Sequence, residues 1–468
     1  MNLKDFIVSP IRARFGEMRS AGRRAPGPQT YAPLGVADEL RDNQPRFLSR
    51  MQRDYGDVAR FRVLWLTVHL VSHPDGVRHV LQENHKGYDK RTRGFEKLKL
   101  LLGNGLLTSD GDFWLRQRRI MQPAFHRERI AAFGTAMARH VEQMCDSWRP
   151  RVEQGETIDV AKEMMRVTLA IVAETLLGTD VSRDTDAVSE SMDVLLHEAN
   201  RRILAAVDVT DFVKNPRHAP GFEPLRRLDE IVWRTIEQRR RAEDRPSDLL
   251  TMLMDARDAE TGEGMTDQQL RDEVITIFLA GHETTANALT WTWYLLSLHP
   301  DARRRLEREL SDALGSRAPT VDDLARLPYA KMVLQESMRL FPPAWLTARR
   351  PVREDVIGGY TIPPDGLVFV SPWVTHRHPA FWDNPEGFDP ERFAPDRVAK
   401  MHRFQYFPFG GGPRICIGQG FAMIEAHLLL ARIAQRYRLD LVPGTTVEPE
   451  PLITLRPKHG LPMRATLR

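Results

Sequence analysis

Cysteine is scarce in this chain, which has only Cys145 and Cys416 among its 468 residues. Two cysteines cannot build the framework of disulfides that stabilises many small secreted proteins. The shortage points to a reducing compartment, and we expect a cytoplasmic protein. It also raises the question of why Cys416 stands between a cluster of glycines and an amphipathic segment.

Long apolar runs are missing as well. The N-terminal stretch MNLKDFIVSPIRARFGEMRSAGRRAPGP has only Phe6, Ile7 and Val8 in a row before Ser9. A membrane span needs about 20 apolar residues, and a signal peptide needs an apolar core of its own. We therefore expect no membrane span, and we interpret residues 1–30 as a basic lead-in.

An excess of charge of one sign is also lacking. The formal net charge is +4, from 67 Lys and Arg against 63 Asp and Glu. A nucleic-acid-binding domain concentrates basic residues on one surface, so we expect no nucleic-acid partner. A content of 42% hydrophobic residues instead indicates a folded protein with a large core.

The secondary-structure pattern is mainly helical. Residues 58–63 (VARFRV) and 64–72 (LWLTVHLVS) are rich in β-branched and aromatic residues and predict paired strands. Residues 110–310 have mostly helical periodicity and no internal repeat, and short strands follow over 355–371. The sequence thus predicts a mainly α fold with small β-sheets (α+β).

The longest predicted helix begins at Thr266, which can form a capping box with Gln269, and ends before His299 and Pro300. At 1.5 Å per residue, its roughly 32 residues span about 48 Å. Because it is apolar on most faces, we expect it to pass through the middle of the protein.

Cys416 directly precedes another predicted helix, which runs from Gly418 to about residue 438. A helix N-terminus favours negative charge and so favours the thiolate. No GK[ST] ending follows, which argues against a phosphate loop. The residues alone leave three interpretations: a buried structural cysteine, a catalytic nucleophile, or the single thiolate ligand of a haem iron.

The surroundings of Cys416 resemble the haem-ligand signature F-x-x-G-x-R-x-C-x-G of the cytochrome P450 family. The resemblance implies a cytochrome P450 fold, with haem b (iron protoporphyrin IX) between the long central helix and the cysteine-bearing helix. Cys416 would be the iron ligand. The matching positions are Phe409, Gly412, Arg414, Cys416 and Gly418.

The long helix contains AGHETT at 280–285, similar to the family's [AG]-G-x-[DE]-T-[TS]. A glycine followed by two threonines is unfavourable in a helix, and such local violations often mark function. We expect a threonine hydroxyl to bond back to a carbonyl and to open the helix locally. By resemblance, Thr284 positions dioxygen, Glu283 relays protons and Ala280 lies against the haem.

Further positions are assigned through the resemblance. Trp114 and Arg118 match W-x-x-x-R, and with Arg414 and Arg349 they would hold the haem propionates, with Arg350 as the alternative to Arg349. A buried network that locks the cysteine loop would be formed by Glu336, Arg339 and Arg392. His376 and His378 are interpreted as polar loop residues rather than metal ligands.

The resemblance implies one haem domain over residues 31–468 and a monooxygenase that inserts one atom of O2 into a lipophilic small molecule, by hydroxylation or epoxidation. The alternative is a haem-thiolate binding or sensor protein without turnover, which the intact Glu283 and Thr284 disfavour. Only a short stretch follows Cys416, so we expect electrons from a separate ferredoxin or flavodoxin with its reductase.

Two surfaces are predicted by the same analogy. Arg116, Arg119, Arg432 and Arg436 could attract an acidic redox partner, although solvated helix charge explains them equally well. The substrate pocket would be lined by mostly apolar segments, namely 87–104, 198–223, Phe278 with Ala280, 344–347, and Ile453 with Thr454.

Overall fold

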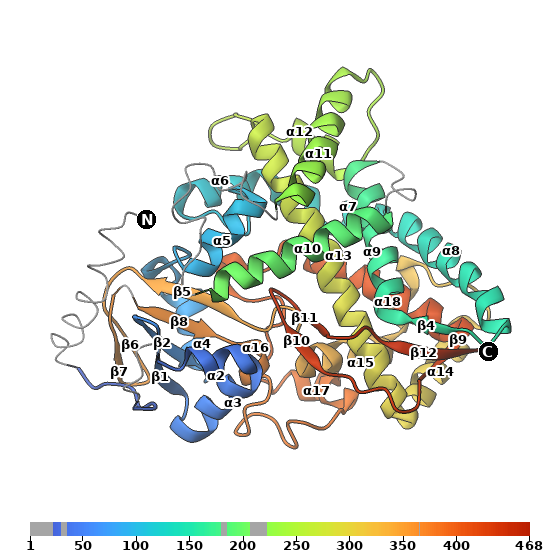
Figure 1. Ribbon diagram of the computed structural model, residues 1–468. Helices are drawn as coiled ribbons and strands as arrows, with labels where there is room; N and C mark the ends of the chain where they lie inside the picture. The colour runs from blue at the N-terminus through green and yellow to red at the C-terminus, as the bar shows by residue number, and fades with distance from the viewer. Residues whose placement is uncertain (1–21, 30–34, 179–184, 206–221, 365) are drawn as a thin grey trace.

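The computed structural model describes residues 22–29, 35–178, 185–205, 222–364 and 366–468. Most of the predicted lead-in and the centre of the predicted pocket segment 198–223 lie outside these residues. The described part is mainly helical with small sheets, which confirms the predicted fold class (Figure 1).

Helices make up most of the structure. The α-helices are α2 (Ala37–Asp42), α3 (Gln44–Tyr55), α4 (Pro74–Arg78), α5 (Arg93–Leu102), α6 (Gly111–Met121), α7 (Arg127–Ala132), α8 (Gly134–Glu153), α9 (Val160–Leu177), α10 (Thr185–Leu204), α11 (Glu223–Arg241), α12 (Leu249–Asp255), α13 (Asp267–Leu298), α14 (Pro300–Leu314), α15 (Pro328–Leu340), α16 (Pro372–Thr375), α17 (Pro395–Val398) and α18 (Gln419–Arg436). Shorter helical turns are η1 (His79–Glu83), η2 (His85–Gly87), η3 (Gln122–Phe125), η6 (Val321–Arg326), η7 (Pro390–Phe393) and η8 (Gly412–Arg414).

The strands form small sheets, the largest with the order β1-β2-β8-β5-β3. The predicted pairing of the first two strands is confirmed: β1 and β2 are antiparallel, with Val58 opposite Val71. The strands are β1 (Val58–Val63), β2 (Leu66–Val71), β3 (Tyr88–Asp89), β4 (Thr157–Asp159), β5 (Thr347–Pro351), β6 (Asp355–Ile357), β7 (Tyr360–Ile362), β8 (Leu367–Val370), β9 (Tyr437–Leu441), β10 (Pro449–Pro451), β11 (Leu455–Pro457) and β12 (Pro462–Leu467).

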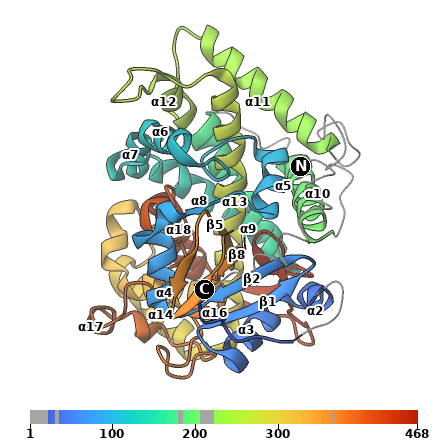
Figure 2. The same ribbon diagram turned by 90° about the vertical axis from the view of Figure 1, so that its left-hand side faces the viewer.

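Helix α13 passes through the middle of the molecule in both views (Figures 1 and 2). It starts with the predicted capping box, in which Gln269 N donates to Thr266 Oγ1 at 3.2 Å and Thr266 N donates to Gln269 Oε1 at 2.8 Å. It ends before His299 and contains 32 residues. The position, length and ends of the long helix are therefore as predicted.

Two hydrophobic cores meet α13 on either side of residues 280–285. One core contains Val274 and Phe278 with residues of α5, α6 and α9 to α12. The other contains Ala286 and Leu289 with residues of α8, α14, α15 and α18. The stretch between these cores is the part of α13 that side-chain packing leaves available for a site.

The last part of the predicted lead-in packs on the sheets. Arg60 N of β1 donates to Pro26 O at 2.7 Å, and Thr361 N of β7 donates to Arg23 O at 2.9 Å. Ala25 is buried among core residues of this region. Residues 22–29 therefore behave as part of the folded structure.

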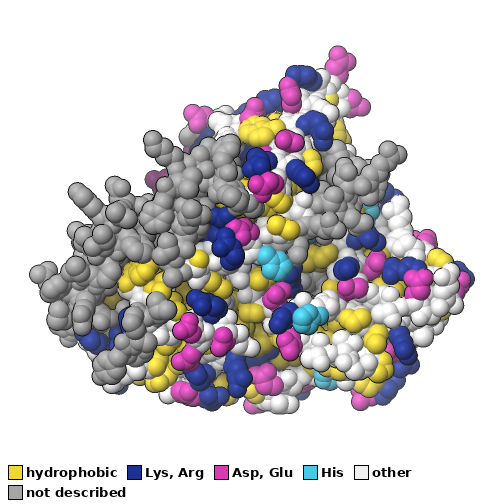
Figure 3. Space-filling view, viewed as in Figure 1, with side chains coloured by type: hydrophobic (Ala, Val, Ile, Leu, Met, Phe, Trp, Pro, Cys, Tyr) yellow, Lys and Arg dark blue, Asp and Glu magenta, His cyan; other side chains and the backbone are white. Residues whose placement is uncertain are grey.

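The surface mixes charges of both signs. On the face shown in Figure 3, basic and acidic side chains are interspersed, and hydrophobic side chains are more frequent toward the left. Within the described residues, no helix is both long enough and apolar enough to cross a membrane.

Candidate functional site

The loop before α18 curls tightly around Cys416. The backbone N–H of Cys416 donates to Phe409 O at 2.9 Å, which closes the loop at its base. Gly412 has φ +65°, and a Cβ there would lie 1.9 Å from the carbonyl oxygen of Leu81. A side chain is excluded at this position by both the backbone conformation and the close approach of η1.

Cys416 retains exposed side-chain surface although protein atoms surround its thiol. Burial raises the pKa of this thiol, although the backbone of Gly418 and Gln419 and the charge of Arg118 act to lower it. The helix N-terminus therefore acts in the expected direction, but the loss of water outweighs it and the net pKa is raised. A bound metal ion would supply the missing stabilisation.

The part of α13 that faces α18 also has an exposed residue among buried neighbours. Ala280 is exposed, whereas Phe278, Leu279 and His282 are buried. An exposed alanine in the middle of a central helix marks a space that the protein's own side chains leave unfilled. Exposed surface at Ala280 and at Cys416 fits a flat group held between α13 and α18, as the resemblance predicts.

Both threonines of the AGHETT stretch bond back to their own helix. Thr284 Oγ1 donates to Ala280 O at 2.7 Å, and Thr285 Oγ1 donates to Gly281 O at 3.2 Å. These back-bonds are as predicted. The predicted local opening is wrong, because α13 is continuous through this stretch. The threonine back-bonds are accommodated without breaking the helix.

Glu283 is buried and is held by residues far away in the sequence. Its Oε1 accepts a hydrogen bond from Thr454 Oγ1 at 2.6 Å. Asn287, one turn further along α13, donates to the same hydroxyl at 3.0 Å. Thr454 stands in the turn between β10 and β11, so the C-terminal strands fix the position of this carboxylate.

Arg118 and Arg414 anchor the cysteine loop to α6. Arg118 Nη1 donates to Ile415 O, the residue before the cysteine, at 2.9 Å. Arg414 donates to Ser109 O at 2.8 Å and forms an ion pair with Asp110. Its guanidinium carbon lies 4.0 Å from the centre of the Trp114 ring. The predicted residues Trp114, Arg118 and Arg414 thus come together beside Cys416.

The choice between Arg349 and Arg350 follows from their partners. Arg350 pairs with Asp89, with its Nη2 2.7 Å from Oδ2. Arg349 on β5 is half-buried and donates to Thr347 Oγ1 and Ala348 O, both at 2.9 Å. Burial and the charge of Arg414 lower its pKa to about 10. Arg349 is therefore the member of the pair that acts electrostatically on Lys90.

Lys90 is a site residue that the sequence analysis missed. Its Nζ donates to Leu107 O at 2.7 Å, and the side chain is buried. Burial and the charges of Arg349 and Arg414 hold its pKa well below the usual range. The pairing of β3 with β5 brings it here, a long-range contact for which the sequence carries no local signal.

The charges in this cluster do not balance. Lys90, Arg349 and Arg414 influence one another electrostatically, and Asp110 is the carboxylate that acts on all three. Buried cations in excess destabilise a protein unless an anion pairs with them. A ligand with two carboxylates, such as the two propionates of haem, would neutralise the excess, so the residues present fit this cofactor.

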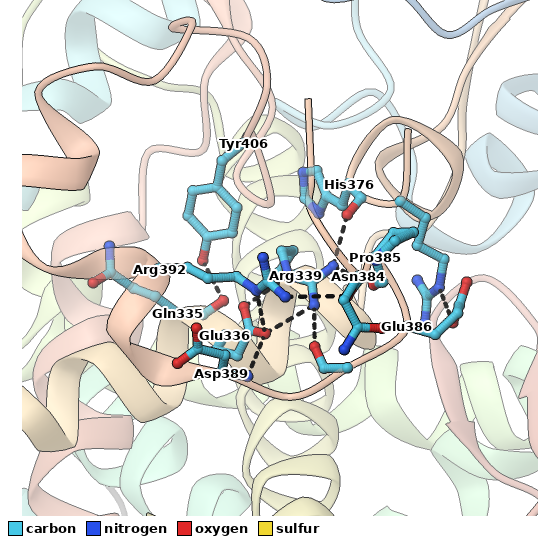
Figure 4. A network of polar contacts seen from close by, with 12 residues as sticks. Gln335, Glu336, Arg339, His376, Asn384, Pro385, Glu386, Asp389, Arg392 and Tyr406 are labelled. Atoms are coloured by element: carbon cyan, nitrogen blue, oxygen red, sulfur yellow. Dashed lines mark hydrogen bonds and ion pairs between the residues drawn. The ribbon is translucent and has the colours of Figure 1, made fainter. Parts of the chain in front are cut away.

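The predicted ion network is present on α15 (Figure 4). Arg339 donates from Nε and Nη2 to the two oxygens of Glu336, at 2.7 and 2.8 Å, and both side chains are fully buried. Arg339 also donates to Pro385 O and Gly387 O. Arg392 contacts Glu336 less closely, with Nε 3.4 Å from Oε1.

The two histidines of HRHP are buried structural residues. His376 Nε2 accepts a hydrogen bond from Phe407 N at 2.9 Å, and its carbonyl accepts from Arg339 at 2.9 Å. His378 contacts Asp57, with 2.8 Å between Nε2 and Oδ1. His376 thereby connects the Arg339 network to the chain that leads into the cysteine loop.

An apolar pocket of about 270 Å³ lies beside the largest sheet, at β1, β2, β5 and β8. Residues of the predicted segments 87–104, 198–223 and 344–347 line it together with Ile453, as expected. Phe278, Ala280 and Thr454 do not line it, and residues 206–221 lie outside the described chain. The additional lining residues, which were not predicted, come from α2, β1, β2 and β8 and include Leu40, Val63, Leu66 and Phe369.

Comparisons with known proteins give a consistent result. The family model for cytochrome P450 matches residues 26–461. Cyclooctatin synthase of Streptomyces melanosporofaciens is 41% identical, over 86% of this chain and 87% of its own. Cyclooctat-9-en-7-ol 5-monooxygenase of the same organism is 36% identical, over 84% of each chain.

A solved structure is similar in fold. The crystal structure of the cytochrome P450DA heme domain has a TM-score of 0.88 and 27% identity, and the match covers 96% of this chain and 98% of that one. Together with the fold and the cysteine loop, these findings identify the chain as a member of the cytochrome P450 family, a haem-thiolate monooxygenase.

Proposed function

We propose that this monooxygenase oxygenates a neutral terpenoid that reaches the oxygen site through the apolar pocket, by hydroxylation or epoxidation. The substrate class is inferred from the cations of the pocket, which already have partners within the protein. Among the described lining residues the cations are Arg41 and Arg93. Arg41 lies 3.5 Å from Asp38, and Arg93 donates to carbonyls at the end of α10, including Ala205 O at 2.8 Å.

A carboxylate in this pocket would be buried among apolar side chains while the nearby cations already have partners. Such burial is costly, whereas a hydrocarbon or an alcohol loses little on leaving water. The relative named as a monooxygenase of cyclooctat-9-en-7-ol acts, by its name, on an unsaturated alcohol. This supports a neutral substrate for the present chain.

Binding measurements test the substrate class. We expect neutral terpene alcohols to shift the haem spin state at concentrations at least about tenfold lower than fatty acids of equal carbon number, a difference of about 1.4 kcal/mol. The methyl ester of each fatty acid is the matched control, because it removes only the charge. Equal affinity for the acid and its ester would contradict the proposal.

The cofactor-binding roles follow the geometry described above. Cys416 would bind the iron, and Trp114, Arg118, Arg349, Arg414 and Lys90 would bind or neutralise the propionates. Ala280 would lie against the ring, while Phe409, Gly412 and Gly418 would give the cysteine loop its shape. The haem supplies the oxygen-activating chemistry, which thiolate ligation favours.

The protein's own contribution to the reaction is position and protons. Thr284 and Ala280 would line the oxygen site, with the Thr284 hydroxyl held by its bond to Ala280 O. Glu283 would pass protons toward this site, and Thr454 and Asn287 keep its carboxylate in place. Proton delivery by a positioned acid is typical of enzymes that consume protons during turnover.

The Lys90→Met variant tests the propionate site. We expect it to bind haem about tenfold more weakly, because one of the buried cations that face the propionates is lost. The rate of haem transfer to apomyoglobin measures the change. Arg91→Met is the control, since Arg91 is largely exposed and pairs with Asp89. A Lys90→Met protein that keeps haem as firmly as the control would remove Lys90 from the site.

Electrons would come from a separate ferredoxin or flavodoxin with its reductase, and we place the protein in the cytoplasm, where its two cysteines would stay reduced. Residues 31–468, together with residues 22–29 that pack on the sheets, would form one haem domain. The arginines predicted to attract the partner already have acidic neighbours: Arg432 and Arg436 contact Glu142, and Arg119 contacts Asp258. Their attraction for an acidic partner is correspondingly reduced.

A further inference from the structure

A group of buried polar atoms lies between α13 and the loop of residues 103–109. Glu273, Gln117 and Ser109 have no exposed surface, and Thr276 is 5% exposed. The atoms Gln117 Oε1, Ser109 Oγ and Thr276 Oγ1 have no hydrogen-bond partner. Because buried polar atoms without partners are costly, such a place normally holds ordered water.

The contacts place Glu273, Gln117 and Thr276 around Gly105 and Leu106 of this loop. Glu273 Oε2 accepts a hydrogen bond from Leu106 N at 2.9 Å. Its other oxygen is only weakly held, because Gln117 Nε2 is 3.5 Å away. Gly105 lies against Thr276: a Cβ on this glycine would be 2.3 Å from Thr276 Oγ1. One carboxylate oxygen of Glu273 is therefore available for water.

Glu273 can gain or lose a proton near neutral pH. Burial is the largest cause of the shift that raises its pKa to about 8, and the charge of Asp272 adds to it, while the bond from Leu106 acts in the opposite direction. Both the acid and the carboxylate are therefore accessible under ordinary conditions.

The other charged groups around this point are already paired. Arg271 contacts Asp229 of α11 and Asp272 of α13. Arg118 of α6 donates to Ile415 O. Closer to the cysteine loop, Arg414 and Asp110 pair with each other.

The position of Glu273 on α13 connects it to the haem cavity. Residues 273, 280 and 284 recur at helical spacing and share one face of the helix, with about 10 Å along the axis between Glu273 and Ala280. Thr276, with its unpartnered hydroxyl, lies between them. On the other side, Asn104, two residues before Leu106, is exposed.

We propose that Glu273 donates protons to the reaction through buried water along this face of α13, as a second route beside that of Glu283. The proposal rests on the proposed placement of the oxygen site beside Ala280 and Thr284. Each turnover consumes two protons and two electrons with RH and O2, and gives ROH and H2O. The electrons come from the redox partner, and Glu273 regains its proton from solvent on the side of the 103–109 loop.

Infrared spectroscopy tests the proton on Glu273 independently of activity. We expect the haem-loaded protein to show a carboxylic-acid C=O band that shifts in D2O and disappears with a midpoint near pH 8. Glu273→Gln should lack this band, while its side-chain oxygen still accepts from Leu106 N. Asp272→Asn is the control for the loop contact, because Asp272 accepts from Asn104 N at 2.8 Å. It should keep the band with a lower midpoint, because the charge of Asp272 no longer raises the pKa of Glu273. Glu425 is also buried and has its pKa raised well above the usual value, so it should give a band that stays in both variants. Persistence in Glu273→Gln of the band that titrates near pH 8 overturns the proposal.

The yield of product per electron tests the route. We expect Glu273→Gln to lower this yield roughly tenfold. The loss should be only partial, because Glu283 would still deliver protons. Asp272→Asn should stay near the wild-type value. An unchanged yield in Glu273→Gln overturns the proposal whatever the spectra show. An unchanged yield in Thr284→Ala contradicts the proposed oxygen site instead, so the two failures can be told apart.

Thr276→Val provides a second variant that keeps the acid. It should retain the infrared band, slow the exchange of that band in D2O, and lower the yield in the same direction as Glu273→Gln. Exchange and yield both equal to wild type would show that water along this face does not carry the proton.

Discussion

Replacing Cys416 by alanine should abolish oxygenation and remove the thiolate-type spectrum of the haem-loaded protein. Cys416 has exposed side-chain surface in the loop before α18, where Phe409 O and Gly412 fix the backbone. Without the sulfur, the iron loses the ligand that favours O–O cleavage. Absorption spectra and product formation with a reductase system measure the two effects.

Cys145→Ala is the matched control for this experiment. Cys145 lies fully buried in α8, within the core formed with α18. Its replacement should lower stability slightly, by about 1 kcal/mol for the lost packing, and should leave the spectrum unchanged. Loss of the thiolate spectrum in Cys145→Ala, or its survival in Cys416→Ala, would contradict the assignment of the ligand.

Replacing Arg339 by methionine should have the largest effect on stability. Arg339 forms two hydrogen bonds to Glu336 and further bonds to the carbonyls of His376, Pro385 and Gly387. Removing one partner of a buried ion pair leaves the other charge uncompensated, which costs about 3 to 5 kcal/mol. Denaturant unfolding of the haem-loaded protein measures the loss.

Arg392→Met separates the roles within this network. Arg392 approaches Glu336 at 3.4 Å and donates to Asn384 O at 3.1 Å, so its contacts are fewer and weaker. We expect a loss of about 1 kcal/mol and normal haem content. If both arginine variants lost stability equally, the pair of Glu336 and Arg339 would not be the main link of the network.

The features that the sequence predicted well are those set by local chemistry. The capping box at Thr266, the proline that stops the central helix and the pairing of the first two strands all depend on residues near one another in the sequence, and each is confirmed. The predicted helix that follows Cys416 is also present, as α18. The long helix is apolar on most faces, so other elements must pack around it, and this places it in the centre of the protein.

The features that were missed depend on long-range packing. Lys90 reaches the site only because β3 pairs with β5. The pKa of Cys416 is raised because burial outweighs the helix N-terminus, and burial cannot be measured along a sequence. The expected opening of α13 at Thr284 failed because a back-bonded threonine also fits a continuous helix.

The reduced, CO-bound absorption spectrum of the haem-supplied protein tests most directly whether Cys416 holds the haem between α13 and α18. A thiolate ligand shifts the main haem band to long wavelength, and this account predicts that shifted band. A spectrum of the kind given by histidine-ligated haem, or a protein that takes up no haem, would contradict it.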